Sequence, residues 1–273
     1  MVSELTKESL RLDLAVAKAE IVKFIRTTLK KAGKVGVVLG LSGGVDSSTV
    51  AALCVSALEA KNVMGLIMPS SITRSEDVED AKFIAKMLGI EHEIIKITPL
   101  EEAFSNLCHH YGQTDRIATG NVTPRVRMTI LYYHANSLNR LVVGTGNKSE
   151  LVIGYYTKYG DGGVDILPIG DLYKTQVRKL AEYLGIPKSI IHKVPTAGLW
   201  AGQTDEDEIG VKYDVLDLIL HGLMELRMKP MEIARQLEIP VDTVNRVLAM
   251  MQRSEHKRQP PPIAKISWKK VGR

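Results

Sequence analysis

The chain has few cysteines and no long apolar segment. Two of its 273 residues are cysteine, Cys54 and Cys108, which excludes a disulfide framework and the paired-cysteine metal and redox motifs. No run of apolar residues approaches the length needed to cross a bilayer. The first residues mix charged side chains with leucines, unlike a secretory signal peptide. We therefore expect a cytoplasmic protein without membrane contact.

Most of the chain also lacks an excess of charge. Of its 36 basic and 31 acidic residues, seven basic and one acidic residue lie at 253–273, a segment that we call the basic tail. This tail carries a net charge of +6, and the remaining 252 residues carry −1. Because a nucleic-acid-binding protein needs a basic face rather than a basic end, we predict that the chain binds no nucleic acid.

Residues 231–251 have the pattern of a helix-turn-helix, which is the main argument for a DNA-binding alternative. A recognition helix would need basic and polar side chains for the major groove. Residues 241–251 contain one arginine among Val, Leu, Ala and Met. This composition is typical of a helix that packs against others, and it disfavours the DNA-binding alternative.

The hydrophobic pattern alternates strands and helices. Apolar runs predict strands at 35–41, 63–68, 93–97 and 141–145, and helical spacing predicts helices at 4–32, 49–58, 75–89, from 98 onward and at 123–139. Such alternation predicts an α/β fold in which helices sandwich a parallel, Rossmann-like sheet. A helical C-terminal part follows, and no internal linker is evident, so we expect a single domain over 1–273. Ligands of such sheets bind at the carboxyl ends of the strands.

The first predicted strand runs into the string L-S-G-G-V-D-S-S at 41–48. Two glycines permit positive φ and close approach, and the N–H groups at the start of the next helix favour an anion. It is no Walker A loop, because Val45 and Asp46 stand where that motif needs its lysine. A carboxylate in an anion-binding turn indicates a bridging Mg²⁺ at Asp46. An ordinary turn with Asp46 as an N-cap is the structural alternative.

Polar residues are dense between 145 and 175. Glu150 follows another turn into a helix, where it either offers a second carboxylate to a cation or complements the helix dipole. Three glycines in four positions exclude a regular helix at 156–165, which carries Lys158, Asp161 and Asp165. This composition suits a loop that binds a polar ligand, although a surface loop without a function has the same composition.

Six motifs occur along the chain: S-G-G-V-D-S-S, P-R-V-R-M, G-T-G-N-K-S-E, T-K-Y-G-D-G-G-V-D, P-T-A-G-L-W and S-E-H-K-R. In this order they resemble the ammonia-dependent NAD synthetases, which are N-type ATP pyrophosphatases with the adenine nucleotide alpha-hydrolase type of fold. The first motif is shared with GMP synthetases, argininosuccinate synthetases and tRNA-thiolating enzymes, whereas the fourth and sixth are much narrower. Residues 68–73 are less distinctive, so the adenine contacts stay open.

The resemblance implies an activity. It is the ATP-dependent amidation of deamido-NAD by ammonia to NAD⁺, through a nicotinyl-adenylate, with release of pyrophosphate and AMP. It also implies Mg²⁺ and a homodimer that binds deamido-NAD across its interface. We expect ammonia rather than glutamine as the nitrogen source, because the residues before 33 leave no room for a glutaminase and Cys54 is expected in the core. A separately encoded ammonia donor is compatible with this expectation. A GMP synthetase subunit or a tRNA thiolase is the alternative.

The resemblance further implies the site residues. For ATP they are Gly40, Leu41, Ser42, Gly43, Gly44, Val45, Asp46, Ser47, Thr145, Lys174 and Thr196. For deamido-NAD they are Arg125, Lys158, Asp165, His256 and Lys257. For Mg²⁺ they are Asp46 and Glu150, and the residues closest to the chemistry are Asp46, Lys174 and Asp161.

Two of these expectations also have a physical argument. A lysine in the first turn of a helix opposes the dipole, so Lys174 fits a role in neutralising phosphate better than an ordinary position; a solvated surface lysine is the alternative. The basic tail, in which the polyproline run 260–262 cannot continue a helix, is expected to act as a mobile lid over bound deamido-NAD. A frayed terminus is the alternative.

Overall fold

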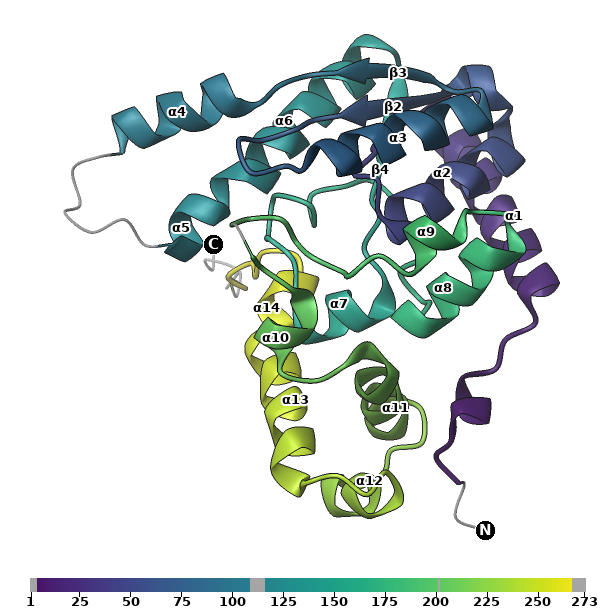
Figure 1. The fold of residues 1–273 in the computed structure, drawn as a ribbon, viewed down its shortest axis with the longest axis vertical. Helices are drawn as coiled ribbons and strands as arrows, with labels where there is room; N and C mark the ends of the chain where they lie inside the picture. The colour runs from purple at the N-terminus through teal and green to yellow at the C-terminus, as the bar shows by residue number, and fades with distance from the viewer. Residues whose placement is uncertain (1–3, 109–115, 201, 267–273) are drawn as a thin grey trace, which may run out of the picture.

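The computed structural model describes residues 4–108, 116–200 and 202–266. Its centre is a four-stranded sheet in the order β3-β2-β1-β4, and every pair of neighbouring strands is parallel (Figure 1). The strands are β1 (Gly36–Gly40), β2 (Val63–Ile67), β3 (Glu91–Ile94) and β4 (Arg140–Val143). The predicted α/β fold with a parallel sheet is confirmed.

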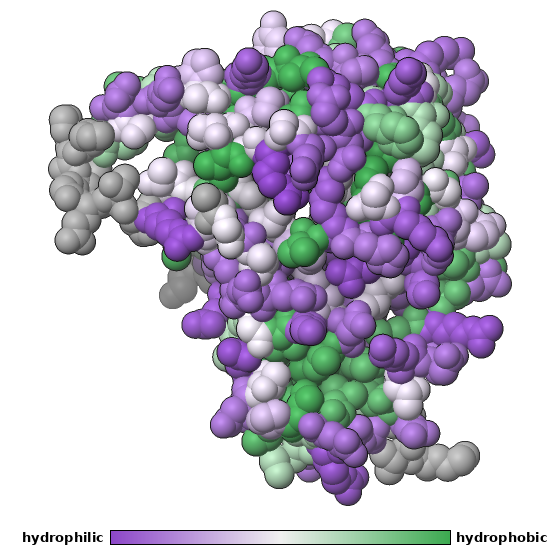
Figure 2. Space-filling model, viewed as in Figure 1, coloured by the Kyte–Doolittle hydropathy of each residue, from purple (hydrophilic) through white to green (hydrophobic). Residues whose placement is uncertain are grey.

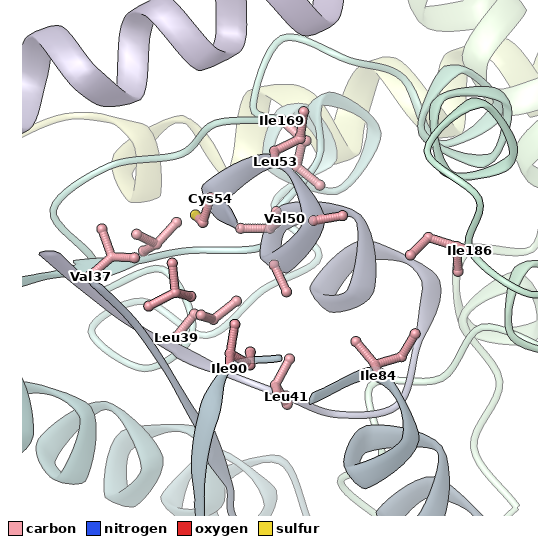
Figure 3. Close-up of a cluster of buried hydrophobic side chains, with 14 of the residues drawn as sticks. Val37, Leu39, Leu41, Val50, Leu53, Cys54, Ile84, Ile90, Ile169 and Ile186 are labelled. Atoms are coloured by element: carbon pink, nitrogen blue, oxygen red, sulfur yellow. The ribbon is translucent and has the colours of Figure 1, made fainter. Parts of the chain in front are cut away.

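Helices cover both faces of the sheet, because alternate residues of each strand point to opposite sides. In β1, Val37 and Leu39 pack into one apolar cluster, and Val38 packs into another. Figure 3 shows the first cluster, in which the Cys54 side chain is fully buried. Helices contributing to it are α1 (Leu14–Ala32), α2 (Val45–Leu58), α3 (Ser75–Leu88), α8 (Lys174–Tyr183) and α9 (Lys188–Ile191). On the other face lies α6 (Val122–Ser137), and α4 (Thr98–Leu107) and α5 (Arg116–Gly120) contact α6.

A third apolar cluster forms the core of the helical C-terminal part, which extends away from the sheet (Figure 1). Figure 2 shows hydrophobic residues gathered on this lower, helical part. Its helices are α7 (Lys148–Ile153), α10 (Asp205–Ile209), α11 (Tyr213–Met224), α12 (Pro230–Gln236), α13 (Val241–Arg253) and α14 (Glu255–Arg258). In α13, Val244 and Val247 are fully buried, as expected of a packing helix. Within the described ranges, no helix is both long and apolar enough to span a membrane.

Three predicted boundaries are wrong. The second helix begins at Val45 rather than at residue 49, directly after its N-cap Gly44. The first helix begins at Leu14 rather than at residue 4, because Asp13 caps it by accepting hydrogen bonds from two N–H groups of the first turn, both at 3.0 Å. Only a short 3₁₀ turn, Lys7–Leu10, precedes this helix. The third strand lies at Glu91–Ile94 rather than at 93–97. All four of its residues are exposed, so the strand shows no alternation of buried and exposed side chains. The buried Ile97 instead precedes α4.

Candidate active site

The turn between β1 and α2 is tightly held. Gly43 has a φ of +74°, and a Cβ on it would lie 2.2 Å from the carbonyl oxygen of Asp77 in α3, so the position requires glycine. The Ser47 hydroxyl lies 3.0 Å from that of Ser42 and accepts the Ser42 N–H at 3.3 Å. Gly44 is the N-cap of α2 with a φ of −94°, so the expected positive φ holds for Gly43 alone. This arrangement leaves the α2 N-terminus at the carboxyl end of β1.

Next to this turn, three charged side chains meet. The Lys174 ammonium donates to Asp46 Oδ2 at 2.5 Å and to Glu150 Oε1 at 3.2 Å. These residues come from the starts of α8, α2 and α7. Lys174 is only 3% exposed, so the solvated alternative is wrong. The structure thus brings together Asp46 and Glu150, which were expected to hold Mg²⁺, and Lys174, which was expected to bind ATP.

Asn147 joins α7 to α2. As N-cap of α7 it accepts the Glu150 N–H through Oδ1, and its own N–H donates to Glu150 Oε2. Its Nδ2 donates to Asp46 Oδ1 at 3.1 Å. Glu150 is therefore a first-turn helix acid that also pairs with the Lys174 ammonium. The N-cap alternative for Asp46 is wrong, since Gly44 caps α2.

A buried polar network fixes the start of α8. Ser149 Oγ accepts the Lys174 N–H at 2.9 Å and donates to Asp217 Oδ1 at 2.5 Å. The other oxygen of Asp217 accepts the Thr175 N–H at 2.8 Å. The face of the fully buried Tyr213 ring lies 5.2 Å from the Lys174 ammonium, a distance at which a cation is attracted to the ring. Interactions of both the backbone N–H and the side-chain ammonium thus fix the position of Lys174.

Sequence reasoning missed several residues of this network. They are Asn147, Ser149, Asp205, Tyr213 and Asp217. One signal was available: Asp217 interrupts an otherwise apolar run at 215–220, where a carboxylate needs hydrogen-bond partners.

The electrostatics follow from crowding of carboxylates in a buried place. The pKa of Glu150 is raised to about 7, chiefly by burial; the charges of Asp46 and Asp205 also raise it, and Lys174 lowers it. Burial lowers the pKa of Lys174, but the negative charges of Asp46 and Glu150 outweigh this effect. The pKa of Lys174 is therefore raised overall. Burial also raises the pKa of Asp205. Its Oδ2 accepts the Tyr213 hydroxyl at 3.2 Å, while its buried Oδ1 has no partner among the described residues.

The donor set fits Mg²⁺ bound together with phosphate. Asp46 and Glu150 each place one oxygen within hydrogen-bond distance of the same nitrogen, so their carboxylates converge. In the part of the chain that the structure describes, no group of three His, Cys, Asp or Glu side chains could hold a metal. Mg²⁺ commonly takes one or two carboxylates and completes its shell with phosphate and water. Two carboxylates beside a turn that can bind phosphate match this coordination.

Four of the five residues expected to bind deamido-NAD gather elsewhere, where the loop 156–165 meets α14. Arg125 Nη2 donates to the Lys158 carbonyl at 3.5 Å, and the Lys158 ammonium donates to the His256 carbonyl at 2.7 Å. The Lys257 ammonium donates to two carbonyls between α7 and that loop, both at 2.6 Å. Residues far apart in sequence therefore form one cationic group.

The fifth residue, Asp165, is bound to β4 and α6: it accepts the Val142 N–H at 2.7 Å and the Tyr132 hydroxyl at 3.0 Å. The loop before it is a series of turns rather than a helix, as predicted. Asp161 holds this loop by accepting the Thr157 N–H at 2.9 Å.

The two threonines expected near ATP lie apart from the three charged residues. Thr145 lies between β4 and α7. Thr196 is exposed and lies between α9 and α10, where its hydroxyl accepts the Gly198 N–H at 3.1 Å. Across the described ranges, no hydrogen bond connects either threonine to Lys174 or its carboxylates.

Known proteins match nearly the whole length of the chain. The family model described as NAD synthase matches residues 17–261. An NH₃-dependent NAD⁺ synthetase of Archaeoglobus fulgidus is 52% identical over 247 residues, which cover 90% of this chain and 95% of that protein. Among solved structures, an NMN synthetase from Francisella tularensis is similar with a TM-score of 0.82 and 37% identity, covering 94% of this chain and 100% of that one.

An NH₃-dependent NAD synthetase from Campylobacter jejuni, solved with a nitrate ion, is similar with a TM-score of 0.79 and 32% identity, over 93% of this chain and 100% of that one. The matched region includes the turn after β1, Glu150, Lys174 and the S-E-H-K-R motif. Because a family model matches most of its length and its relatives align almost end to end, the chain belongs to the NAD synthase family.

Proposed function

We propose that the chain catalyses the ATP-dependent amidation of deamido-NAD by ammonia, which yields NAD⁺, AMP and pyrophosphate. The family and the name of the Archaeoglobus relative support this reaction. The observation that carries it here is the buried Lys174 ammonium between Asp46 and Glu150, beside the Gly43 turn. Such a site suits cleavage of a nucleoside triphosphate.

In the first step a nicotinate carboxylate oxygen attacks the α-phosphorus of ATP, the bond to pyrophosphate breaks, and an acyl-adenylate forms. The α2 N-terminus and the serines of the turn at 42–47 offer N–H and O–H donors to phosphate oxygens. Lys174 adds positive charge where pyrophosphate leaves. Mg²⁺ held by Asp46 and Glu150 would neutralise further phosphate charge. Thr145 and Thr196 are proposed to complete the ATP site.

In the second step ammonia attacks the activated carbonyl carbon, AMP departs, and the nitrogen loses a proton. Arg125, Lys158, His256 and Lys257 suit the anionic dinucleotide because three are cationic and all gather at one place. Asp165 is proposed to complete that site from the sheet. Asp161 offers a carboxylate that can accept a hydrogen bond from the incoming ammonia.

A homodimer is part of the proposal. Large apolar side chains are exposed on α6 and on the two helices that contact it: Leu100, Phe104 and Leu107 on α4, Ile117 on α5 and Tyr133 on α6. A second copy of the chain would cover this surface, and the dinucleotide would lie across the contact.

The test is a substrate panel. The purified chain receives ATP, Mg²⁺ and ammonia with deamido-NAD, with the acid counterpart of NMN, or with XMP, and both pyrophosphate and the amide product are measured. We expect the highest kcat/KM with deamido-NAD and no turnover when glutamine replaces ammonia. The mononucleotide is the matched comparison because one similar structure is an NMN synthetase. A preference for the mononucleotide or for XMP would overturn the proposal.

A further inference from the structure

The short helix α14 binds to the C-terminal end of α7, with which it lies side by side in Figure 1. Arg258 Nη1 donates to the carbonyls of Val152 at 2.6 Å and Leu151 at 3.2 Å, and Nη2 donates to Met251 in α13 at 2.7 Å. Carbonyls in the last turn of a helix lack helical partners, and a cation there also complements the helix dipole. Arg258 is therefore a side-chain cap for α7 that also ties it to α13.

Two further contacts fix α14 at this place. The Lys257 ammonium donates to the carbonyls of Gly154 and Tyr156, both at 2.6 Å. Gly154 ends α7 with a φ of +74°, and a Cβ there would lie 2.1 Å from the Cβ of Ser254. The Ser254 side chain is buried against α7 and accepts a hydrogen bond from Arg258 at 2.8 Å. The close approach of Ser254 therefore requires glycine at position 154.

The other end of α7 belongs to the charged site. Its N-cap Asn147 binds Asp46, and Glu150 in its first turn binds Lys174. Because α7 is only six residues long, a displacement of its C-terminal end moves the first turn as well. The basic tail and the triphosphate site are thus connected through one rigid element.

We propose that Arg258 is a positioning residue for the first half of the reaction: by capping α7 it holds the Glu150 carboxylate beside Asp46. This inference rests on the proposed function of the site. It assigns the end of the S-E-H-K-R motif to the triphosphate site rather than to the dinucleotide. Arginine suits this role because its planar guanidinium reaches several carbonyls at once, whereas a lysine ammonium is a point charge on a flexible stem.

The experiment compares Arg258→Ala and Arg258→Lys with Arg253→Ala, an exposed arginine at the end of α13. Two readouts need no turnover: hydrogen exchange of the peptide covering 148–154, and binding of Mn²⁺ with a non-hydrolysable ATP analogue, followed by electron paramagnetic resonance. For Arg258→Ala we expect about five- to tenfold faster exchange in α7 and a Kd for Mn²⁺ raised by about tenfold. Arg258→Lys is expected between that variant and the wild type, and Arg253→Ala is expected to match the wild type.

Faster exchange with unchanged Mn²⁺ affinity would show a purely structural cap and overturn the inference. So would unchanged exchange, or a raised KM for deamido-NAD with unaltered metal binding. If Arg258→Ala does not fold, Arg258→Lys decides by the same two readouts. Because neither readout requires NAD⁺ formation, a wild-type chain that binds Mn²⁺ and ATP but makes no NAD⁺ would overturn the proposed function and leave this inference standing.

Discussion

At the scale of single residues, Lys174 is an internal counter-ion. It is buried between two carboxylates that would repel each other without it. Removing one partner of a buried ionic group is strongly destabilising, because the remaining charges lie in a poorly solvated place. The same lysine therefore contributes to the stability of the fold and to the chemistry of the site.

We predict that Lys174→Met lowers the free energy of unfolding by about 3 kcal/mol in the absence of divalent metal. Added Mg²⁺ should restore part of this loss, since it binds the carboxylate pair that has lost its ammonium, and it does so in the folded state alone. Urea unfolding with and without Mg²⁺ measures both effects. If Lys174→Met unfolds without metal at the same urea concentration as the wild type, the counter-ion role is contradicted. Lys179→Met, an exposed lysine on the same helix, is the control.

The two cysteines should differ sharply in reactivity. Burial raises the pKa of the Cys54 thiol to about 12, so at pH 8 only about one molecule in 10⁴ carries the thiolate. Cys108 is exposed. A thiol-specific chromogenic reagent should therefore titrate one cysteine in the native protein and two in guanidinium chloride. In the Cys108→Ser variant only Cys54 remains, and its rapid reaction in the native protein would contradict the prediction by showing that Cys54 is accessible.

Single residues were predictable where motifs named them. The two predicted turns into helices indicated Asp46 and Glu150, the resemblance indicated these two and Lys174, and the structure brings all three together. Asn147 and Tyr213 were not predictable, since their roles depend on a 3.1 Å bond to a residue about 100 positions away and on a ring face beside an ammonium. Spacing in the sequence contains no information on such contacts.

At the scale of elements, a clamp of charges holds the turn before α2 against α3. The Lys193 ammonium donates to the Gly43 carbonyl at 3.3 Å, to Asp77 at 2.9 Å and to Asp80. Burial raises the pKa of Asp77, but hydrogen bonds from Arg74 and Lys193 outweigh this effect. The pKa of Asp77 is therefore lowered overall. The turn is thus held by a side chain that directly precedes the segment carrying Thr196.

Gly43→Ala should lower the free energy of unfolding by about 2 kcal/mol, because alanine is strained at positive φ and its Cβ would meet the Asp77 carbonyl. Gly44→Ala is the matched control: its φ is −94°, and its Cβ would lie 3.4 Å from the nearest atom, Ser42 Oγ. Guanidinium unfolding of both variants gives the comparison. Equal midpoints would show that the turn adapts to a side chain.

Elements were predicted better than their ends. Gly33 and Gly89 stop α1 and α3 in the left-handed conformation, and both stops were readable from the sequence. The start of α1 was not, because Asp13 caps the helix while the apolar spacing continues before it. β3 was misplaced by two to three residues, since its exposed side chains contain no alternation.

At the scale of the whole molecule, the exposed apolar side chains of α4, α5 and α6 predict self-association. Sedimentation equilibrium at micromolar concentration should give twice the chain mass of 30.1 kDa. Leu107→Glu, at a position 76% exposed, should weaken the dimer and reduce the rate of NAD⁺ formation together. A fully active monomer would contradict the shared dinucleotide site.

The lid proposed for the basic tail can be separated from α14. Its residues 267–273 lie outside the described ranges, and the part that the structure describes beyond α14 is exposed. A chain that ends after Arg258 keeps the cap on α7 and removes the remaining tail. We predict that this variant makes more AMP than NAD⁺, because water reaches the acyl-adenylate. One-to-one AMP and NAD⁺ formation would show that the rest of the tail is no lid.

The order of the strands has a consequence for biosynthesis. Val37 in β1 pairs with Val63 on one side and with Leu141 on the other. A growing chain therefore completes one edge of β1 early, but the second edge stays open until β4 has left the ribosome. That edge belongs to a strand whose Val37, Val38 and Leu39 are fully buried in the finished protein. Open apolar edges pair with other chains, so the nascent protein is most prone to aggregate while residues 68–139 are leaving the ribosome.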